Sequence, residues 1–244
     1  MKKLLKISLT LLLISAAACA ILLLSRNSAL LEEKLKKALQ PEERDTRVEE
    51  SDAQIETEEE PEEAPLSEES SERLKEKAEE ALAFCKSNNY NTDFSILIDM
   101  KIHSGKHRLF VYDFNRQKIE RKSLCAHGSG KGNRLSTGEQ PLFGNVEGSL
   151  LTSLGKYEIG ARAYSNWGIN VHYKLHGLDT SNSNAFKRII VLHSYTPIPV
   201  DEMYPLHLPR GWSQGCPVID DETMTYLDVK LKDVEKPVLL WIYY

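Results

Sequence analysis

Alternating hydrophobic and polar positions dominate the C-terminal part of the chain. Apolar side chains recur at every second residue from Phe94 to Ile98, which is the period of a strand with one face in a core. The same kind of pattern predicts further strands over 108–114, 118–126, 156–164, 170–175, 187–195 and 238–244. The polar stretch 115–117 joins the first two of these as an antiparallel hairpin. Many short strands without alternating strand–helix units predict a mainly antiparallel β domain over residues 90–244.

Two segments of the C-terminal part have helical spacing instead. Residues 70–89 show one apolar stripe that includes Cys85, with Ser70 or Ser71 in position to cap the helix. A shorter helix is expected over 220–230, because an aspartate stands where its N-cap would be. The longer helix leads directly into the predicted β domain.

The first 26 residues have the pattern of a targeting segment. A start with three lysines precedes an apolar run of 18 residues from Ile7 to Leu24, which Arg26 follows. Such a run fits a signal anchor or a signal peptide, and the lysines orient the rest of the chain away from the cytoplasm. Because the apolar run continues past the small residues before Cys19, an uncleaved anchor ranks first. A lipoprotein modified on Cys19 ranks second, and a freely secreted protein third.

Charged residues are distributed very unevenly along the chain, although its formal net charge is only −5. Helical spacing over residues 27–41 predicts a juxtamembrane helix, and an acidic segment over 42–69 follows it. Residues 42–72 hold fifteen Asp or Glu, two Arg and no aromatic residue, a composition typical of a disordered, self-repelling linker. Residues 73–244 carry a net charge of +3, which gives no support for nucleic-acid binding.

A cysteine and a histidine near the C-terminus are the candidate catalytic residues. Cys216 stands in the segment Gly-Trp-Ser-Gln-Gly-Cys-Pro, and His193 ends the apolar run of the preceding predicted strand. A cysteine attacks a carbonyl as its thiolate, and a nearby histidine can take the thiol proton and return it to a leaving amine. Gly215 lets backbone amides approach a developing oxyanion. On spacing alone, a buried structural cysteine and a core histidine are an equally good interpretation.

Several motifs accompany this pair in a definite order. They are Arg108-Leu109-Phe110-Val111-Tyr112-Asp113, Phe143-Gly144-Asn145, Thr152-Ser153-Leu154-Gly155-Lys156-Tyr157, Leu175-His176-Gly177-Leu178, Val191-Leu192-His193-Ser194 and Ser213-Gln214-Gly215-Cys216-Pro217. Over residues 90–244 the chain resembles the YkuD-type catalytic domain of L,D-transpeptidases, in the variant found in murein L,D-transpeptidases. The resemblance implies a YkuD-like antiparallel β-sandwich with a few short helices, preceded by the membrane segment and the acidic linker.

The resemblance also implies a reaction. Cys216 would attack a peptide bond between an L-centre and a D-residue in a peptidoglycan stem peptide, and His193 would move the protons. The thioester would pass to the amine of a neighbouring stem and form a cross-link. Transfer to water instead would make the protein an L,D-carboxypeptidase. A third alternative is a domain that binds the cell wall without catalysis.

Further residues are candidates for shaping this site. They are Gly215, Ser194 and Ser213 for the oxyanion and for positioning, and His176, Trp212 and Gln214 for substrate binding. For Ser194 the implied role is that its backbone carbonyl orients His193. Pro217-Val218 stands where the wider family often has an arginine, so the group that would bind substrate carboxylates is not evident from the sequence.

No cofactor or metal is expected. His172 and His176 share one face of a predicted strand, and with His193 and Cys216 they are the candidate zinc set. An H-x-x-x-H pair on a strand is not a usual ligand geometry, and the H-E-x-x-H motif is missing. The zinc-peptidase interpretation is therefore not favoured.

Location and cysteine content leave two questions open. We expect an enzyme of the cell envelope, anchored in the inner membrane with its catalytic domain in the periplasm, or held there by lipid on Cys19. In that oxidising compartment a disulfide between Cys85 and Cys125 is possible. Peptidoglycan stem peptides are the expected partners, and the sequence does not predict an oligomeric state.

Overall fold

The computed structural model describes residues 66–244, which belong to one compact unit, Glu63–Tyr244. The predicted anchor over 1–26, the juxtamembrane helix over 27–41 and the linker up to residue 65 lie outside the described residues. Within 66–244 no helix is both long and apolar enough to cross a membrane.

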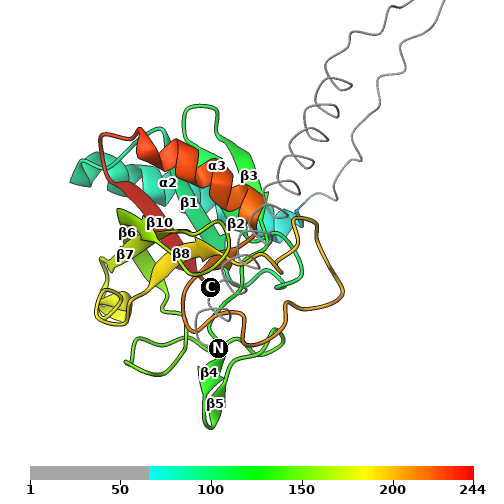
Figure 1. Cartoon of the computed structure of the whole chain (residues 1–244). Helices are drawn as coiled ribbons and strands as arrows, with labels where there is room; N and C mark the ends of the chain where they lie inside the picture. The colour runs from blue at the N-terminus through cyan, green and yellow to red at the C-terminus, as the bar shows by residue number, and fades with distance from the viewer. Residues whose placement is uncertain (1–65) are drawn as a thin grey trace, which may run out of the picture. The chain divides into compact units, whose positions relative to one another are not determined.

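Eight strands form one sheet in the order β3-β2-β1-β10-β6-β7-β8-β9 (Figure 1). The strands are β1 Phe94–Asp99, β2 Leu109–Asp113, β3 Lys118–Ser123, β6 Gly155–Tyr164, β7 Val171–Gly177, β8 Val191–Ser194, β9 Val218–Ile219 and β10 Val238–Tyr243. A separate small hairpin consists of β4 (Gly130–Lys131) and β5 (Arg134–Leu135) in the glycine-rich segment after β3. The mainly β fold predicted from the alternating pattern is therefore confirmed.

Two neighbouring strand pairs are parallel, which the sequence pattern did not indicate. The C-terminal strand β10 lies in the middle of the sheet, parallel to β1 with Ile96 opposite Leu240, and antiparallel to β6. All six residues of β10 are buried, since a central strand of this sheet is covered on both faces. At one edge β9 runs parallel to β8, with His193 opposite Val218. This pairing brings the loop before β9 next to β8.

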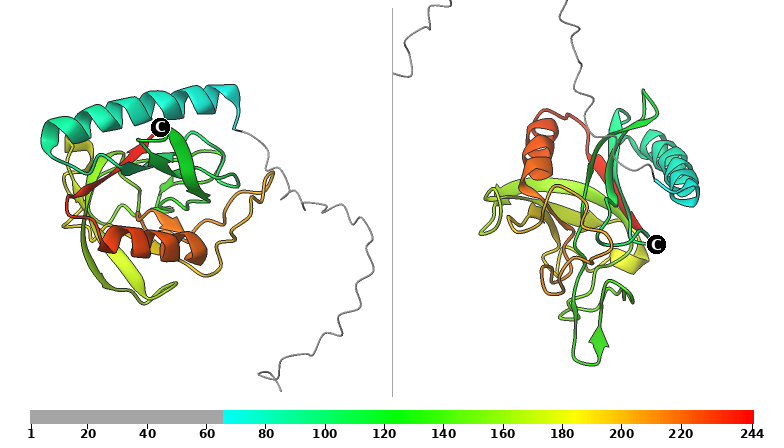
Figure 2. Two further views of the ribbon diagram at one scale, coloured as in Figure 1. Left: turned by 90° about the horizontal axis from the view of Figure 1, so that it is seen from above. Right: turned by 90° about the vertical axis from the view of Figure 1, so that its right-hand side faces the viewer.

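Two helices cover opposite faces of the sheet: α2 (Glu68–Asn88) and α3 (Asp221–Lys232) (Figure 2). Alternate residues of β1 contribute to the two resulting cores. Ile96 and Ile98 pack in the core on the α3 side, and Leu97 packs in the core on the α2 side. The sheet is thus the middle layer, and its central strands β1 and β10 are buried along their whole length.

The helix expected over 70–89 begins two residues earlier, at Glu68. Its N-cap is Ser67 and not one of the two serines expected, because the Ser67 hydroxyl accepts a hydrogen bond from the backbone N–H of Ser70 at 3.3 Å. Glu68 and Glu69 lie in the first turn, where negative charge is favourable. Residues 68 and 69, which we expected in the linker, therefore belong to this helix.

The strand expected over 187–195 is also shorter, because β8 begins only at Val191. Before it the chain turns, and the backbone N–H of Arg188 donates to the carbonyl of Asn184 at 2.8 Å. Ile189 has a φ of +56° and is 75% exposed, so it is not part of the buried strand. A positive φ is rare for a β-branched residue, and here it belongs to the turn that leads into the site.

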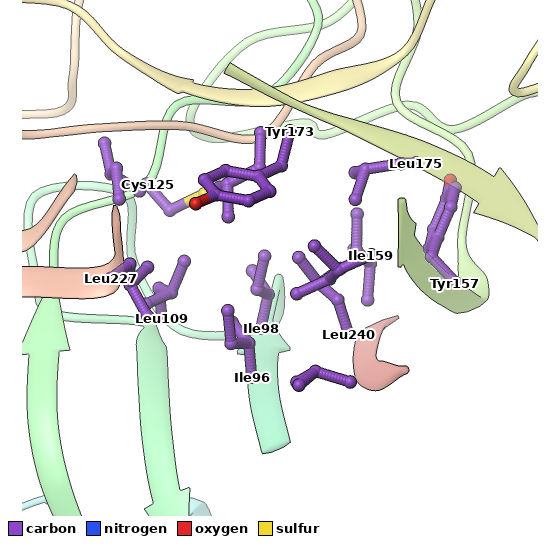
Figure 3. Packing of buried hydrophobic residues seen from close by; sticks show 14 of the residues in the cluster. Ile96, Ile98, Leu109, Cys125, Tyr157, Ile159, Tyr173, Leu175, Leu227 and Leu240 are labelled. Atoms are coloured by element: carbon purple, nitrogen blue, oxygen red, sulfur yellow. The ribbon is translucent and has the colours of Figure 1, made fainter. Parts of the chain in front are cut away.

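The cysteines at 85 and 125 are free and lie in different cores. Cys85 packs on the α2 side of the sheet, while Cys125 packs on the α3 side near Tyr173 and Leu227 (Figure 3). Burial raises the pKa of each thiol to about 11. The disulfide that the sequence left open is therefore not formed, because the sheet separates the two side chains.

Candidate active site

One cavity of about 760 Å³ is lined by both predicted catalytic side chains, Cys216 and His193. His193 belongs to β8, and Cys216 lies in the loop just before β9, the strand that pairs with β8. The turn after β6, which includes Trp167, and the turn before β8 form other walls. The parallel β8–β9 pairing thus brings together a thiol and an imidazole that are separated by a long proline-containing loop.

The loop that carries Cys216 is held by hydrogen bonds from both sides. The Ser213 hydroxyl donates to the carbonyl of Cys216 at 2.6 Å and accepts from the N–H of Gly215 at 3.0 Å. From another segment, the Thr152 hydroxyl donates to the carbonyl of Gly215 at 3.1 Å and accepts from the N–H of Gly128 at 2.9 Å. The backbone around the thiol is therefore fixed. Thr152 belongs to one of the sequence motifs, but it was not among the candidate site residues, because its contact with Gly215 depends on the fold.

Gly215 adopts a conformation that other residues rarely adopt, with a φ of +121°. A Cβ there would lie 2.9 Å from the carbonyl oxygen of Leu151 and 3.1 Å from Nη2 of Arg188. Because its N–H is bonded to the Ser213 hydroxyl, Gly215 positions the nucleophile in this state and does not present its amide to the cavity. Within residues 66–244, the backbone N–H of Cys216 makes no hydrogen bond, and it is the candidate oxyanion donor.

The Cys216 thiol is in contact with the turn before β8. Its sulfur accepts from the N–H of Val191 at 3.4 Å and lies 3.9 Å from the carbonyl oxygen of Ile189. Burial raises the pKa of this thiol, while the Val191 N–H and the charge of Arg188 lower it. The strained residue Ile189 is therefore part of the segment that surrounds the sulfur.

The imidazole of His193 is oriented by a backbone carbonyl. Its Nδ1 lies 2.9 Å from the carbonyl oxygen of Ser194, so Nδ1 carries the proton and Nε2 is the free basic nitrogen. Burial lowers the pKa of His193, and the Ser194 carbonyl raises it. His193 and Cys216 are not hydrogen-bonded to each other in the described chain, and such contacts often tighten only when substrate binds.

Ser194 contributes to the site through its backbone, while its side chain is buried. The hydroxyl of Ser194 accepts from the N–H of Ile169 at 3.1 Å, which holds the turn after β6 against β8. The three expected positioning residues, Gly215, Ser194 and Ser213, are thus brought together around Cys216 and His193. Each acts on the backbone geometry of the site.

Arg188 is a cavity residue that the sequence did not indicate. Its guanidinium donates to the carbonyls of Gly144 and Leu151 and to the hydroxyl of Ser153. Val218, the position at which the family resemblance led us to look for an arginine, is fully buried. The sequence carried no signal for Arg188, because it reaches the site only through the unexpected turn before β8.

Aromatic rings line one side of the cavity. Tyr195 meets Trp167 and Trp212 edge-to-face, with ring centroids 5.7 Å and 5.8 Å apart. Gln214 also lines the cavity. Two of the three expected substrate-binding residues, Trp212 and Gln214, therefore lie beside the thiol.

His176, the third, is not a lining residue of this cavity. Its ring stacks on Phe186 at 5.2 Å, and a Cβ on Gly160 would lie 2.4 Å from its Nε2. His172, by contrast, does line the cavity and lies opposite His193 in the β7–β8 ladder. Among residues 66–244 no group of three or more His, Cys, Asp or Glu side chains is arranged to hold a metal ion.

Comparison with solved structures gives remote likenesses. The helical cell shape determining protein Pgp2 of Campylobacter jejuni is 16% identical with a TM-score of 0.38, over 68% of this chain and 54% of that one. An L,D-transpeptidase (residues 123–326) of Xylanimonas cellulosilytica is 12% identical with a TM-score of 0.35, over 62% of this chain and 60% of that one. The L,D-transpeptidase of Mycobacterium smegmatis is 10% identical with a TM-score of 0.35, over 62% and 59%. The chain spans less than two thirds of each, and likenesses of this degree carry no argument about function.

Comparison with protein families, by contrast, identifies the family to which the chain belongs. No curated protein matches the chain. The family model described as the L,D-transpeptidase catalytic domain matches residues 67–243, a region that begins at the N-cap of α2 and includes all residues of the cavity. The YkuD-type resemblance is thereby confirmed, and the chain belongs to the L,D-transpeptidase catalytic domain family, whose function is related to peptidoglycan.

Proposed function

We propose that this protein is a cysteine L,D-transpeptidase that forms or remodels peptidoglycan cross-links through a thioester on Cys216. The observation that carries the proposal is the shared cavity of Cys216 and His193, with Nε2 of His193 left free by the contact of Nδ1 with Ser194. A thiol and an oriented base in one cavity are the parts that nucleophilic acyl transfer needs. Family membership adds the substrate class, peptidoglycan stem peptides.

In the acylation step, Nε2 of His193 takes the thiol proton and the Cys216 sulfur attacks the carbonyl carbon between an L-centre and a D-residue. The N–H of Cys216 donates to the oxyanion of the tetrahedral intermediate. As the intermediate collapses, the C–N bond breaks and the imidazolium gives its proton to the departing amine. The acyl group remains on Cys216 as a thioester.

In the transfer step, the side-chain amine of a second stem peptide attacks the thioester. His193 takes a proton from this amine, the C–S bond breaks, and the sulfur regains a proton as a new amide is completed. Water in place of the amine leaves a shortened stem and makes the reaction an L,D-carboxypeptidase step. Transpeptidation and the carboxypeptidase reaction use the same residues of this protein. They differ only in whether an amine or water reaches the thioester in the cavity.

The test is incubation of the full chain, solubilised in detergent, with disaccharide-tetrapeptides, followed by mass spectrometry. A dimer that has lost one D-residue supports transpeptidation, whereas a shortened monomer alone assigns carboxypeptidase activity. Cys216→Ala should abolish both products, and Cys85→Ala, a cysteine in the α2-side core, should retain them. Absence of product together with absence of carbapenem labelling on Cys216 would overturn the enzymatic proposal and favour a cell-wall binding domain.

The proposal includes a location. Residues 1–26 anchor the chain in the inner membrane, and the catalytic domain acts in the periplasm, where peptidoglycan lies. The support is the basic start and the apolar run of the sequence. Intact mass spectrometry of the membrane-extracted protein should give the uncleaved chain, and a processed N-terminus with lipid on Cys19 would replace the anchor with a lipoprotein.

A further inference from the structure

Arg188 carries a positive charge that no carboxylate within residues 66–244 neutralises. Its Nη1 donates to the carbonyl of Gly144 at 3.0 Å and to the hydroxyl of Ser153 at 2.6 Å, and its Nη2 donates to the carbonyl of Leu151. All three acceptors are neutral. The guanidinium is thus held in a fixed position while its charge remains available to an anion nearby.

This charge lies against the turn that carries the nucleophile. Nη2 of Arg188 would be 3.1 Å from a Cβ on Gly215, the residue before Cys216. Arg188 and Cys216 line the same cavity. Burial raises the pKa of Cys216 and lowers the pKa of Arg188, and against these shifts the charge of each group favours the charged form of the other.

The other ionisable groups around the thiol supply no free cation near neutral pH. Burial lowers the pKa of His193 on β8 and of His172 on β7, so both imidazoles are neutral. Lys187 is paired with Glu147 at 2.7 Å. Burial raises the pKa of Tyr157 on β6, so its phenol is uncharged. Among the described groups around the thiol, Arg188 is thus the cation that no carboxylate pairs with, and it acts on the sulfur together with the N–H of Val191.

We propose that Arg188 is the positioning residue that stabilises the Cys216 thiolate through its charge. It would thereby supply, from the turn before β8, a cation that the chain lacks at Val218. A buried thiol resists ionisation unless a cation or a hydrogen-bond donor favours the thiolate. The use of this thiolate in catalysis rests on the proposed function, whereas the acidity of the thiol is a property of the protein without substrate.

The test is the pH dependence of alkylation by iodoacetamide, measured on the full chain by peptide mass spectrometry so that each cysteine is followed separately. Only the thiolate reacts, so the midpoint of the rate against pH gives the pKa of Cys216. In Arg188→Gln we expect this midpoint to rise by about one pKa unit, which lowers the rate below the midpoint about tenfold. A midpoint equal to that of the wild type would overturn the proposal.

Two variants separate charge from structure. Arg188→Lys keeps the charge but loses the planar donor fork, and should keep the midpoint nearer to the wild type than to Arg188→Gln. Lys187→Gln removes the adjacent cation together with its ion pair, and should leave the midpoint unchanged. Equal shifts in Arg188→Lys and Arg188→Gln would mean that the hydrogen bonds, and not the charge, are responsible. Cys85 and Cys125, both fully buried, report on folding, because they stay unreactive in any variant that is folded.

This readout is independent of enzymatic activity. A chain without transpeptidase or carboxypeptidase activity, whose Cys216 midpoint still depends on Arg188, would remove the proposed function and leave this inference standing. An active enzyme whose Cys216 midpoint does not change when Arg188 is replaced would overturn this inference and leave the proposed function standing. The two proposals can therefore fail separately.

Discussion

At the scale of single residues, the position of Cys216 depends on a hydroxyl from a distant part of the chain. Thr152 is fully buried and bridges the N–H of Gly128 and the carbonyl of Gly215. Thr152→Val keeps the shape but leaves both backbone groups without a partner, so we expect the free energy of unfolding to fall by about 1–3 kcal/mol. Urea unfolding measures this loss, and the acylation rate of Cys216 should fall with it.

Thr152→Ser is the matched control, because it keeps the hydroxyl and removes only a methyl group. It should retain most of the acylation rate, while its stability falls by the smaller cost of a lost methyl. If the acylation rate fell as far in Thr152→Ser as in Thr152→Val, packing of the methyl group would be the important contribution, and the hydroxyl bridge would not.

Two glycines of the loop that carries Cys216 differ in the space available for a side chain. Gly215 and Gly211 both have positive φ, at +121° and +100°. A Cβ at Gly215 would meet backbone and guanidinium atoms near 3 Å, whereas at Gly211 it would meet nothing within 4 Å. We therefore expect Gly215→Ala to abolish acylation of Cys216, and Gly211→Ala to incur only the cost of the backbone conformation, about 1–3 kcal/mol. Similar rates of acylation in the two variants would contradict the steric argument.

The reactive residues could be predicted from the sequence, but the residues that surround and position them could not. Cys216 and His193 could be selected because nucleophile and base are defined by residue type. Thr152 and Arg188 could not be selected, since threonine and arginine are common and their roles arise only from contacts across the fold. His176 shows the opposite case, because a motif position suggested a site residue whose ring lies outside the cavity.

At the scale of secondary-structure elements, one ion pair fixes α2 to the sheet. Arg73 of α2 contacts the carboxylate of Asp99 in β1 at 2.7 Å, and the Asp99 side chain has no exposed surface. Arg73→Ala would leave this buried charge unpaired, and should destabilise the protein by about 3–5 kcal/mol. Arg116→Ala removes a looser ion pair with Asp113 at 3.7 Å, in which the arginine side chain is mostly exposed, and should change stability by less than about 0.5 kcal/mol. Thermal or urea unfolding distinguishes the two, and equal effects would mean that α2 is held by its apolar face alone.

Elements were predictable where their contacts are local. The β2–β3 and β6–β7 pairs follow from alternation and short connections, and both are antiparallel as expected. The placement of β10 beside β1 could not be predicted, because a strand buried on both faces has no alternating pattern to show its neighbours. The start of β8 was misplaced for a related reason: Ile189 extends an apolar run in the sequence, while its side chain points to solvent.

At the scale of the whole molecule, the site exists because distant segments meet at one edge of the sheet. The β8–β9 pairing joins the base to the nucleophile, and the segments near 128 and 152 hold the nucleophile loop from the other side. The sequence motifs come from these segments, but their order along the chain does not show how the segments meet in space. The same buried contacts also make the stability of the molecule sensitive to pH.

His127 gives that pH dependence a definite sign. Burial, together with the charge of Arg108 at 2.9 Å from its Nδ1, lowers its pKa to about 4. In the unfolded chain a histidine titrates near pH 6.5, so between these values the unfolded state binds a proton that the folded state resists. The stability contributed by neutral His127 is therefore fully present above about pH 6.5 and is lost as the pH falls towards about 4, by up to about 3 kcal/mol.

Urea unfolding of the full chain at about pH 7 and about pH 4.5 tests this linkage. His127→Asn is the informative variant, because asparagine can still accept a hydrogen bond from Arg108 but does not titrate. The wild type should lose more stability than His127→Asn between the two pH values. The variant should still lose some, since the pKa values of His103, His172 and His193 are also lowered. If both proteins lost the same free energy of unfolding, the contact between Arg108 and neutral His127 would not be the source of the acid sensitivity, and carboxylates such as Asp228, whose pKa is lowered chiefly by Arg162, would become the leading explanation.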